Sequence, residues 1–187
     1  GFNGFQYNTG MNAAAQDFLY DAITGGQSFG SSSGDVTSYL NQLNNDPDIS
    51  LVNQAEALMY APATNQQAIE VRYTALQSAL DAYHQSTGLA VEERDSMLTV
   101  IQQLSQTASA VYGQYLSELN TRLTTVQNML SSVSTTQPYW YNKARSLSVL
   151  AQKWQGTDPD SVQMLMLESI ADQCPLEGGK GVYIARN

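Results

Sequence analysis

The chain repeats apolar residues at intervals of three and four positions over most of its length, and this spacing predicts amphipathic helices. One long example runs through Ile69, Tyr73, Leu76, Leu80 and Tyr83. No stretch alternates apolar and polar residues as a half-buried strand does. The pattern therefore predicts an all-α fold of about eight helices, arranged as an antiparallel bundle or as a short solenoid of helical hairpins.

Capping and breaking residues set the expected helix limits. Ser50 and Thr64 are expected to cap the helices that follow them, and Pro138 suits the first turn of a helix that reaches Gln155. The helix at 90–104 either bends at 105–108 or runs on to Leu130. The faces expected to be buried include Ala14, Phe18, Leu19 and Ala22; Val36, Tyr39, Leu40 and Leu43; Ala144, Leu147, Leu150, Ala151 and Trp154; and Val162, Leu165, Met166, Ser169 and Ile170.

Two polar stretches are candidate boundaries. Residues 30–34 read Gly-Ser-Ser-Ser-Gly, a composition typical of flexible linkers. We therefore expect residues 1–34 to form a lead-in, a first helix and a linker, and residues 35–187 to form a helical domain. A second polar stretch at 131–137 predicts a sub-boundary inside that domain.

The charge narrows the classes of partner. Eight Lys and Arg face 17 Asp and Glu, giving a formal net charge of −9. This balance argues against binding to nucleic acid or to anionic membrane surfaces. No apolar run reaches the 18 residues of a transmembrane helix, so we expect no membrane span. The chain has neither an initiator methionine nor a signal peptide, and we expect it to be a processed or excised piece.

The most unusual chemistry lies near the end of the chain, where the only cysteine precedes a proline and a cluster of glycines. The structural loop predicted here comprises Cys174, Pro175, Gly178, Gly179 and Gly181. Proline ends the preceding helix, and glycine permits positive φ and close backbone approach. We expect Cys174 to be buried between the last two helices, and Gly178 or Gly179 to have positive φ.

The same segment carries a family resemblance over residues 167–187. The matching residues are Ile170-Ala171-Asp172-Gln173-Cys174-Pro175-Leu176-Glu177-Gly178-Gly179 and Val182-Tyr183-Ile184-Ala185-Arg186. This segment resembles the helical region that precedes type IX secretion sorting domains in extracellular and surface proteins of Bacteroidota, many of which carry a β-helix. A more distant similarity begins at residue 91. The resemblance implies a structural segment with no catalytic residues.

No residue set predicts a reaction or a bound cofactor. His84 is the only histidine and has no neighbouring ligand, so a surface position is expected rather than a metal site. Cys174 lacks a basic partner in its own loop. Gly178-Gly179-Lys180-Gly181 lacks the spacing of a phosphate-binding loop, and no strand precedes it. We predict no catalytic, metal or cofactor site and no enzymatic activity.

Two classes of function therefore stand. The first is a structural or interaction module of a secreted or cell-surface protein. Such a module would act as a spacer or adaptor between extracellular repeats and a sorting domain. Its partners would be other domains of its own chain, other surface proteins or copies of itself. The alternative is a helical domain that binds peptides or glycans in an aromatic groove. Asp-Ser pairs before an apolar residue also predict O-glycosylation at Ser96 and Ser161.

Overall fold

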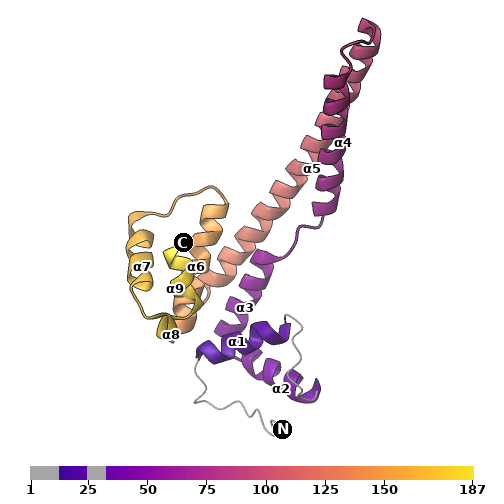
Figure 1. Cartoon of the computed structure of the whole chain (residues 1–187). Helices are drawn as coiled ribbons and strands as arrows, with labels where there is room; N and C mark the ends of the chain where they lie inside the picture. Colours follow the sequence, from indigo (N-terminus) through magenta and orange to yellow (C-terminus); the bar gives the residue numbers. More distant parts are fainter. Residues whose placement is uncertain (1–12, 25–32) are drawn as a thin grey trace. The chain divides into compact units, whose positions relative to one another are not determined.

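The computed structural model describes residues 13–24 and 33–187, and helices are the only regular elements in these ranges (Figure 1). The all-α prediction is confirmed. The helices are α1 (Ala13–Thr24), α2 (Ser33–Asn44), α3 (Pro47–Tyr60), α4 (Gln66–Gln85), α5 (Val91–Ser131), α6 (Pro138–Trp154), α7 (Ser161–Ala171), α8 (Pro175–Gly178) and α9 (Lys180–Arg186). The α8 helix is a single turn.

The chain divides into two units, and the second is inserted into the first. The core unit comprises the chain up to Tyr60 and from Leu123 onward, and the hairpin unit comprises Ala61–Arg122. The α5 helix begins in the hairpin unit and ends in the core unit. The boundary predicted at 30–34 lies mostly outside the described residues and stays a prediction. The polar stretch predicted at 131–137 does separate two helices, α5 and α6.

Two predicted helix starts were wrong, and in each case a different residue supplies the hydrogen bonds. The α3 helix begins at Pro47 rather than after Ser50, because the Asp46 carboxylate accepts hydrogen bonds from the backbone N–H groups of Asp48 (3.0 Å) and Ile49 (3.2 Å). Thr64 does not cap α4: its backbone N–H and its hydroxyl both donate to Glu118 Oε1, at 3.1 and 3.0 Å. The region left open at 105–108 is continuous helix, so α5 spans 41 residues.

In the core unit, α6 is the central helix. It packs against α1, α3, α7, α8 and α9, and the longest contact is with α9. It packs on α3, and α6, α3 and the last turns of α5 all contribute buried apolar side chains to the core of this unit. This core contains Leu43, Ile49, Val52, Met59, Leu123, Val126, Leu130, Trp140, Leu147 and Val182.

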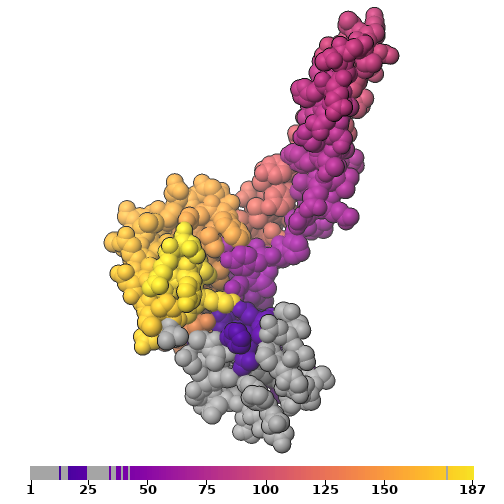
Figure 2. All heavy atoms as spheres, viewed as in Figure 1, coloured from indigo at the N-terminus to yellow at the C-terminus, as the bar shows by residue number. Residues whose placement is uncertain are grey.

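In the hairpin unit, α4 and the first part of α5 lie side by side and run antiparallel (Figures 1 and 2). Near the turn, the Arg94 guanidinium lies over the Tyr83 ring at 5.0 Å from its centroid. At the other end, Asn65 Nδ2 donates to the Val111 carbonyl oxygen at 3.2 Å. The two ends of this unit also meet, because Arg122 Nη1 donates to the Ala61 carbonyl oxygen at 2.7 Å.

The predicted buried faces were correct in part. Leu43, Ala22, Ala144, Leu147, Ala151 and Ile170 are buried. Phe18, Trp154, Val162 and Leu165 are exposed, and the prediction was wrong for them. The α7 helix buries only Ile170, and its main packing contacts are with α9 and α6. The side chains of Ala14, Val36 and Tyr39 lie outside the described set.

Candidate functional site

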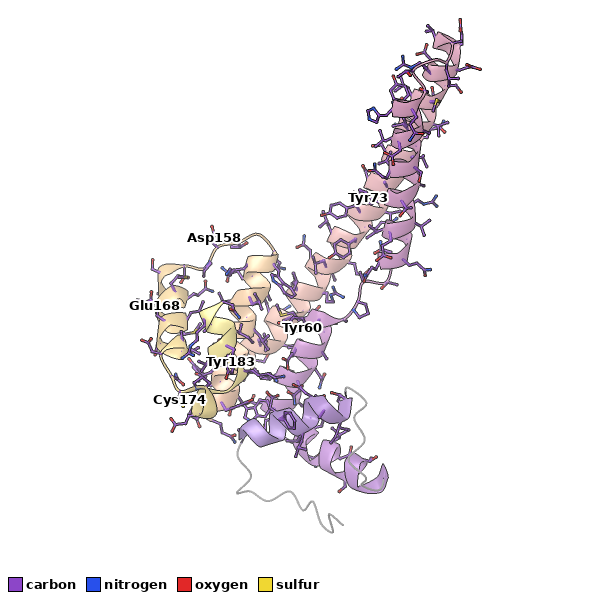
Figure 3. All side chains as sticks on the ribbon, viewed as in Figure 1. Tyr60, Tyr73, Asp158, Glu168, Cys174 and Tyr183 are labelled. Carbon is purple, nitrogen blue, oxygen red and sulfur yellow. The ribbon has the colours of Figure 1, made fainter. Side chains whose placement is uncertain are left out.

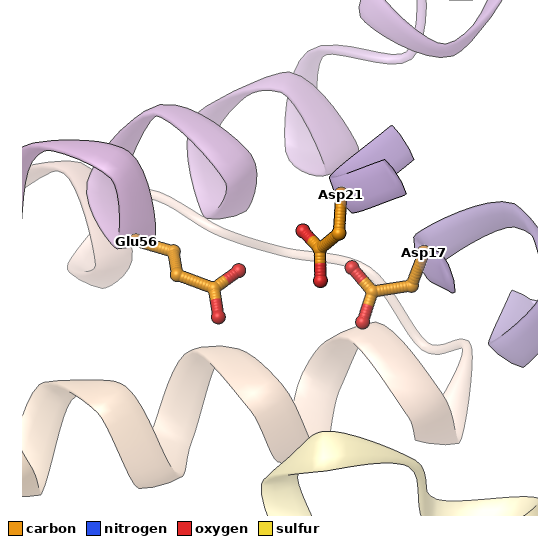
Figure 4. Close-up of side chains that lie close together, drawn as sticks. All are labelled: Asp17, Asp21 and Glu56. Atoms are coloured by element: carbon orange, nitrogen blue, oxygen red, sulfur yellow. The ribbon is translucent and has the colours of Figure 1, made fainter. Parts of the chain in front are cut away.

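The core unit contains a cluster of ionised side chains that the sequence did not predict. Asp17 and Asp21 project from α1 and Glu56 projects from α3, and their carboxylates point toward a common space (Figure 4). One oxygen from each of the three lies within 4.8 Å of the others. Asp17 is fully buried, and Glu56 is largely buried. Three carboxylates this close repel one another unless positive charge lies among them.

Two lysines supply that positive charge. Lys143 of α6 is fully buried, and its Nζ lies 2.5 Å from Asp17 Oδ1 and 2.6 Å from Glu56 Oε2. Lys180 of α9 is ion-paired to Asp21, and its Nζ lies 3.5 Å from Glu56 Oε1. Each lysine therefore joins α1 to α3, and the cluster ties together four helices that are distant in sequence.

A tyrosine completes the network. The Tyr139 hydroxyl donates to Asp17 Oδ2 at 2.6 Å, so both oxygens of this buried carboxylate have partners. Burial raises the pKa of Tyr139 well above its ordinary value, and the hydrogen bond to Asp17 and the negative charge of that carboxylate raise it further. Burial alone lowers the pKa of Lys180, but the hydrogen bond to Asp21 and the charges of Asp17 and Glu56 outweigh it and raise that pKa.

The cluster is suited to holding helices together. Its three carboxylates are spaced closely enough to bind a cation, but the ammonium groups of Lys143 and Lys180 are already bonded to them. A metal would have to displace both lysine ammonium groups, which make five ion pairs with these carboxylates, one of them fully buried. The prediction that the chain has no metal site stays a prediction.

The predicted C-terminal loop comprises the end of α7, α8 and the start of α9, and the prediction was wrong for its cysteine. Cys174 is exposed and precedes Pro175, which occupies the first position of α8 (Figure 3). Its neighbours leave it at the edge of an open hollow of about 740 Å³, together with Tyr139 and Glu177. The described lining of this hollow includes no histidine, the usual base for a thiol nucleophile.

The glycines of the loop account for its packing, and here the prediction was correct. Gly179 has φ of 68°, a conformation that favours glycine, and a Cβ there would overlap the Tyr139 ring. Gly181 lies against the α6 backbone, where a Cβ would stand 2.5 Å from the carbonyl carbon of Asn142. Gly178 is buried beside Val182. The absence of side chains thus lets α9 approach α6 closely.

The other residues of the predicted motif also make packing contacts. Gln173 Oε1 accepts a hydrogen bond from Asn142 Nδ2 at 2.6 Å, which ties the end of α7 to α6. Arg186 Nε donates to the Ala171 carbonyl oxygen at 2.8 Å, and its Nη2 donates to the Gln173 carbonyl oxygen at 3.1 Å. Ile170 and Val182 are buried.

The remaining predicted positions lie on the surface. His84 is exposed on the last turn of α4, as expected. Ser96 of α5 and Ser161 of α7 are both exposed. Asp160 caps α7 through a capping box with Gln163, which gives the Asp160–Ser161 pair a structural explanation. Glycosylation at Ser96 and Ser161 stays a prediction.

The hairpin unit has a different surface. From Val91 to Glu118, the residues of α5 that are not exposed recur at alternating intervals of three and four, the seven-residue repeat of a coiled coil. They are Arg94, Met97, Ile101, Leu104, Ala108, Val111, Tyr115 and Glu118. The α4 helix has no buried residue, although Ile69, Leu76, Ala79 and Tyr83 face α5 in part. The hairpin is thus an antiparallel two-stranded coiled coil with a shallow core.

Exposed apolar side chains flank this seam on both sides of α5: Val100, 47% exposed, lies on one flank, and a longer row lies on the other. Four residues of α5 lie on the face next to the seam, at intervals of 7, 14 and 4 positions: Val91, Leu98, Tyr112 and Leu116. Tyr73 occupies the corresponding flank of α4. In an antiparallel pair these two flanks lie on the same side of the hairpin. The exposed fractions are 46% for Tyr73, 70% for Val91, 44% for Leu98, 43% for Tyr112 and 42% for Leu116. We call these five residues the hairpin stripe; Figure 3 labels Tyr73 on α4.

No family model, curated protein or solved structure matches this chain. Within the described residues, every helix is too short or too polar to cross a membrane.

Proposed function

We propose that this chain is a non-enzymatic structural and interaction module of a secreted or cell-surface protein, a spacer or adaptor between extracellular repeats and a sorting domain. In this proposal the core unit holds the chain in a fixed fold, and the hairpin unit contacts a protein partner. The observation that carries it is the hairpin stripe, because exposed apolar side chains that continue along a coiled-coil seam are typical of helices with a further packing partner.

The division of roles is supported by the core unit. The buried and partly buried charged side chains of its cluster pair with one another, and Gly179 and Gly181 of the motif lie against α6. The segment that resembles the region before type IX sorting domains is thus used for packing, as expected of a structural segment.

Replacing the hairpin tests the proposal in the full-length protein of the native host. The Arg122 side chain donates a hydrogen bond to the Ala61 carbonyl oxygen, so these two residues lie close together and a short Gly-Ser linker can replace residues 62–121. We expect this variant to reach the cell surface at near-normal amounts and to lose its partner in chemical cross-linking of intact cells. A variant that keeps its cross-linked partner would overturn the role of the hairpin, and one that never reaches the surface would overturn the independence of the core unit.

A second candidate is the binding of a peptide or glycan by an aromatic groove in the core unit. Tyr60 and Trp154 make an edge-to-face pair with ring centroids 5.6 Å apart, and both are exposed. Tyr60 also lines a groove of about 190 Å³ together with Val149, Leu150 and Leu167. Titration with peptide and oligosaccharide libraries, followed by tryptophan fluorescence, tests it, and the Tyr60→Ala variant, which keeps Trp154 as the reporter, is the control for specific binding.

A further inference from the structure

The hairpin stripe has the dimensions and the pattern of one half of a four-helix bundle. Two-stranded coiled coils use a narrow seam, whereas helices of larger bundles add apolar residues on one flank. The stripe provides that flank with four residues of α5 and with Tyr73 of α4. Its extent follows from helix geometry: Val91 to Leu116 span about 38 Å, and about 20 Å of width gives roughly 750 Å² per hairpin. Two such faces together bury roughly 1,500 Å², above the roughly 1,200 Å² of small specific interfaces.

We propose that the stripe binds the stripe of a second copy of this chain, an inference that deepens the interaction role proposed above and rests on it. A two-fold symmetric pair places the same patch on both partners, so the patch must be self-complementary. The middle of the hairpin meets this condition, because residues 96–117 of α5 and 73–80 of α4 contain no charged side chain. Two copies can therefore meet there without burying like charges.

The charges at the two ends of the hairpin favour one relative orientation of the two copies in the dimer, the antiparallel one. The turn end carries Asp81, Glu92, Glu93 and Asp95 with only Arg94 in opposition, so it is strongly acidic. At the other end, Glu70 and Glu118 are balanced by Arg72 and Arg122. Two hairpins with their turns together would place eight carboxylates side by side, whereas the antiparallel arrangement sets each acidic turn beside the balanced end of its partner.

Sedimentation equilibrium of the whole chain tests the association. We expect a concentration-dependent dimer for the wild type. In Leu98→Glu/Tyr112→Glu, two charges enter the stripe, and we expect the dimer Kd to rise at least about tenfold. The matched control, Thr99→Glu/Gln106→Glu, adds the same charges to exposed positions of α5 away from the stripe and the seam, and it should dimerise like the wild type. Circular dichroism confirms that all variants are helical.

Cysteine cross-linking tests the orientation in a Cys174→Ser background. On a two-fold axis perpendicular to the helices, residue 105 of one copy lies beside residue 105 of the other. Ser105→Cys should therefore form a disulfide-linked dimer under mild oxidation, and Val91→Cys, near the turn, should not. Preferential cross-linking through residue 91 would overturn the antiparallel arrangement.

The two proposals fail in distinguishable ways. A wild-type chain that stays monomeric at all concentrations overturns self-association. If the hairpin replacement in cells still abolishes a cross-link to a different protein, the interaction role stands with another partner. If no cross-link depends on the hairpin in cells, the interaction role is overturned, and sedimentation equilibrium of the wild type decides self-association separately.

Discussion

At the scale of single residues, the loop near the C-terminus depends on the close approach of two helices. Gly181 is the clearest case, because the atoms that a side chain would meet belong to the α6 backbone and cannot move aside. The glycine cluster and its turn were predictable from sequence. The exposure of Cys174 was not, because the apolar character of cysteine predicts burial and only the path of α8 places this residue outside.

We expect Gly181→Ala to destabilise the protein by about 3 kcal/mol, since the added methyl group must separate α9 from α6. The control is Gly113→Ala in α5, where a Cβ meets no atom within 4 Å. That change should stabilise the protein by about 0.5–1 kcal/mol through helix propensity. Urea denaturation of both variants measures the difference, and equal effects would contradict the proposed close packing.

Lys143 shows what sequence patterns could have revealed about the ion cluster. It occupies the same face of α6 as Trp140 and Leu147, so a charged residue stands within an apolar stripe. This signals a buried partner, because an unpaired buried charge is very costly. The partners themselves were not predictable, since Asp17 and Lys143 are far apart in sequence and nothing local connects them.

We expect Lys143→Met to cost about 3–5 kcal/mol, because it removes the buried ammonium that lies 2.5 Å from Asp17 and 2.6 Å from Glu56 and leaves only the more distant Lys180, at 3.9 and 3.5 Å. Lys153→Met, at an exposed position of the same helix, should cost about 0.5 kcal/mol or less. Thermal and urea unfolding measure both values. A loss as small for Lys143 as for Lys153 would show that the cluster does not hold the core unit together.

The pKa shifts in this cluster predict a loss of stability in alkali. Tyr139 and Lys180 both have raised pKa values in the folded chain, so the native state keeps two protons that the unfolded chain releases above about pH 10. The stability that these two groups contribute is fully present below about pH 10 and is lost as the pH rises through their pKa values in the folded chain. Unfolding free energies measured across this range should fall, and Tyr139→Phe should give a shallower fall. An identical slope in that variant would refute the assignment to Tyr139.

At the scale of helices, the spacing of apolar residues predicted the type of each element better than its limits. The start of α3 was misplaced because Asp46 competes with Ser50 as a cap and Pro47 favours the earlier start. The continuity of α5 was left open, although the three-and-four repeat from Arg94 to Glu118 passes through residues 105–108 without interruption. Counting that repeat in heptads would have predicted the coiled coil.

Capping of α7 gives a prediction at this scale. Asp160 accepts a hydrogen bond from the Gln163 backbone N–H at 2.8 Å, and Gln163 Oε1 accepts one from the Asp160 backbone N–H at 2.9 Å. We expect Asp160→Ala to reduce stability by about 1 kcal/mol. Asp158→Ala, two residues earlier in the exposed connection, should have little effect. Similar losses in the two variants would indicate a general charge effect in place of a cap.

At the scale of the whole chain, the insertion of the hairpin unit into the core unit was not predicted. Patterns along a sequence identify neighbouring helices, whereas the core unit joins residues on both sides of Ala61–Arg122. The polar linkers at 30–34 and 131–137 were therefore the visible candidates. Pro62 marks a break in the chain after Tyr60 but indicates only the end of a helix, and Arg122 lies inside α5 without any change in composition.

The central claim is that the hairpin stripe contacts protein on the cell surface. Its most direct measurement is site-specific photo-cross-linking in intact cells of the native host, with a photoreactive amino acid at position 112 of the full-length protein. Position 106, on the same helix away from the stripe, and position 183, exposed on α9 of the core unit, are the controls. The account predicts a protein adduct from position 112 and at most trace adducts from positions 106 and 183. Equal yields at all three positions, or adducts from position 183 alone, would contradict it.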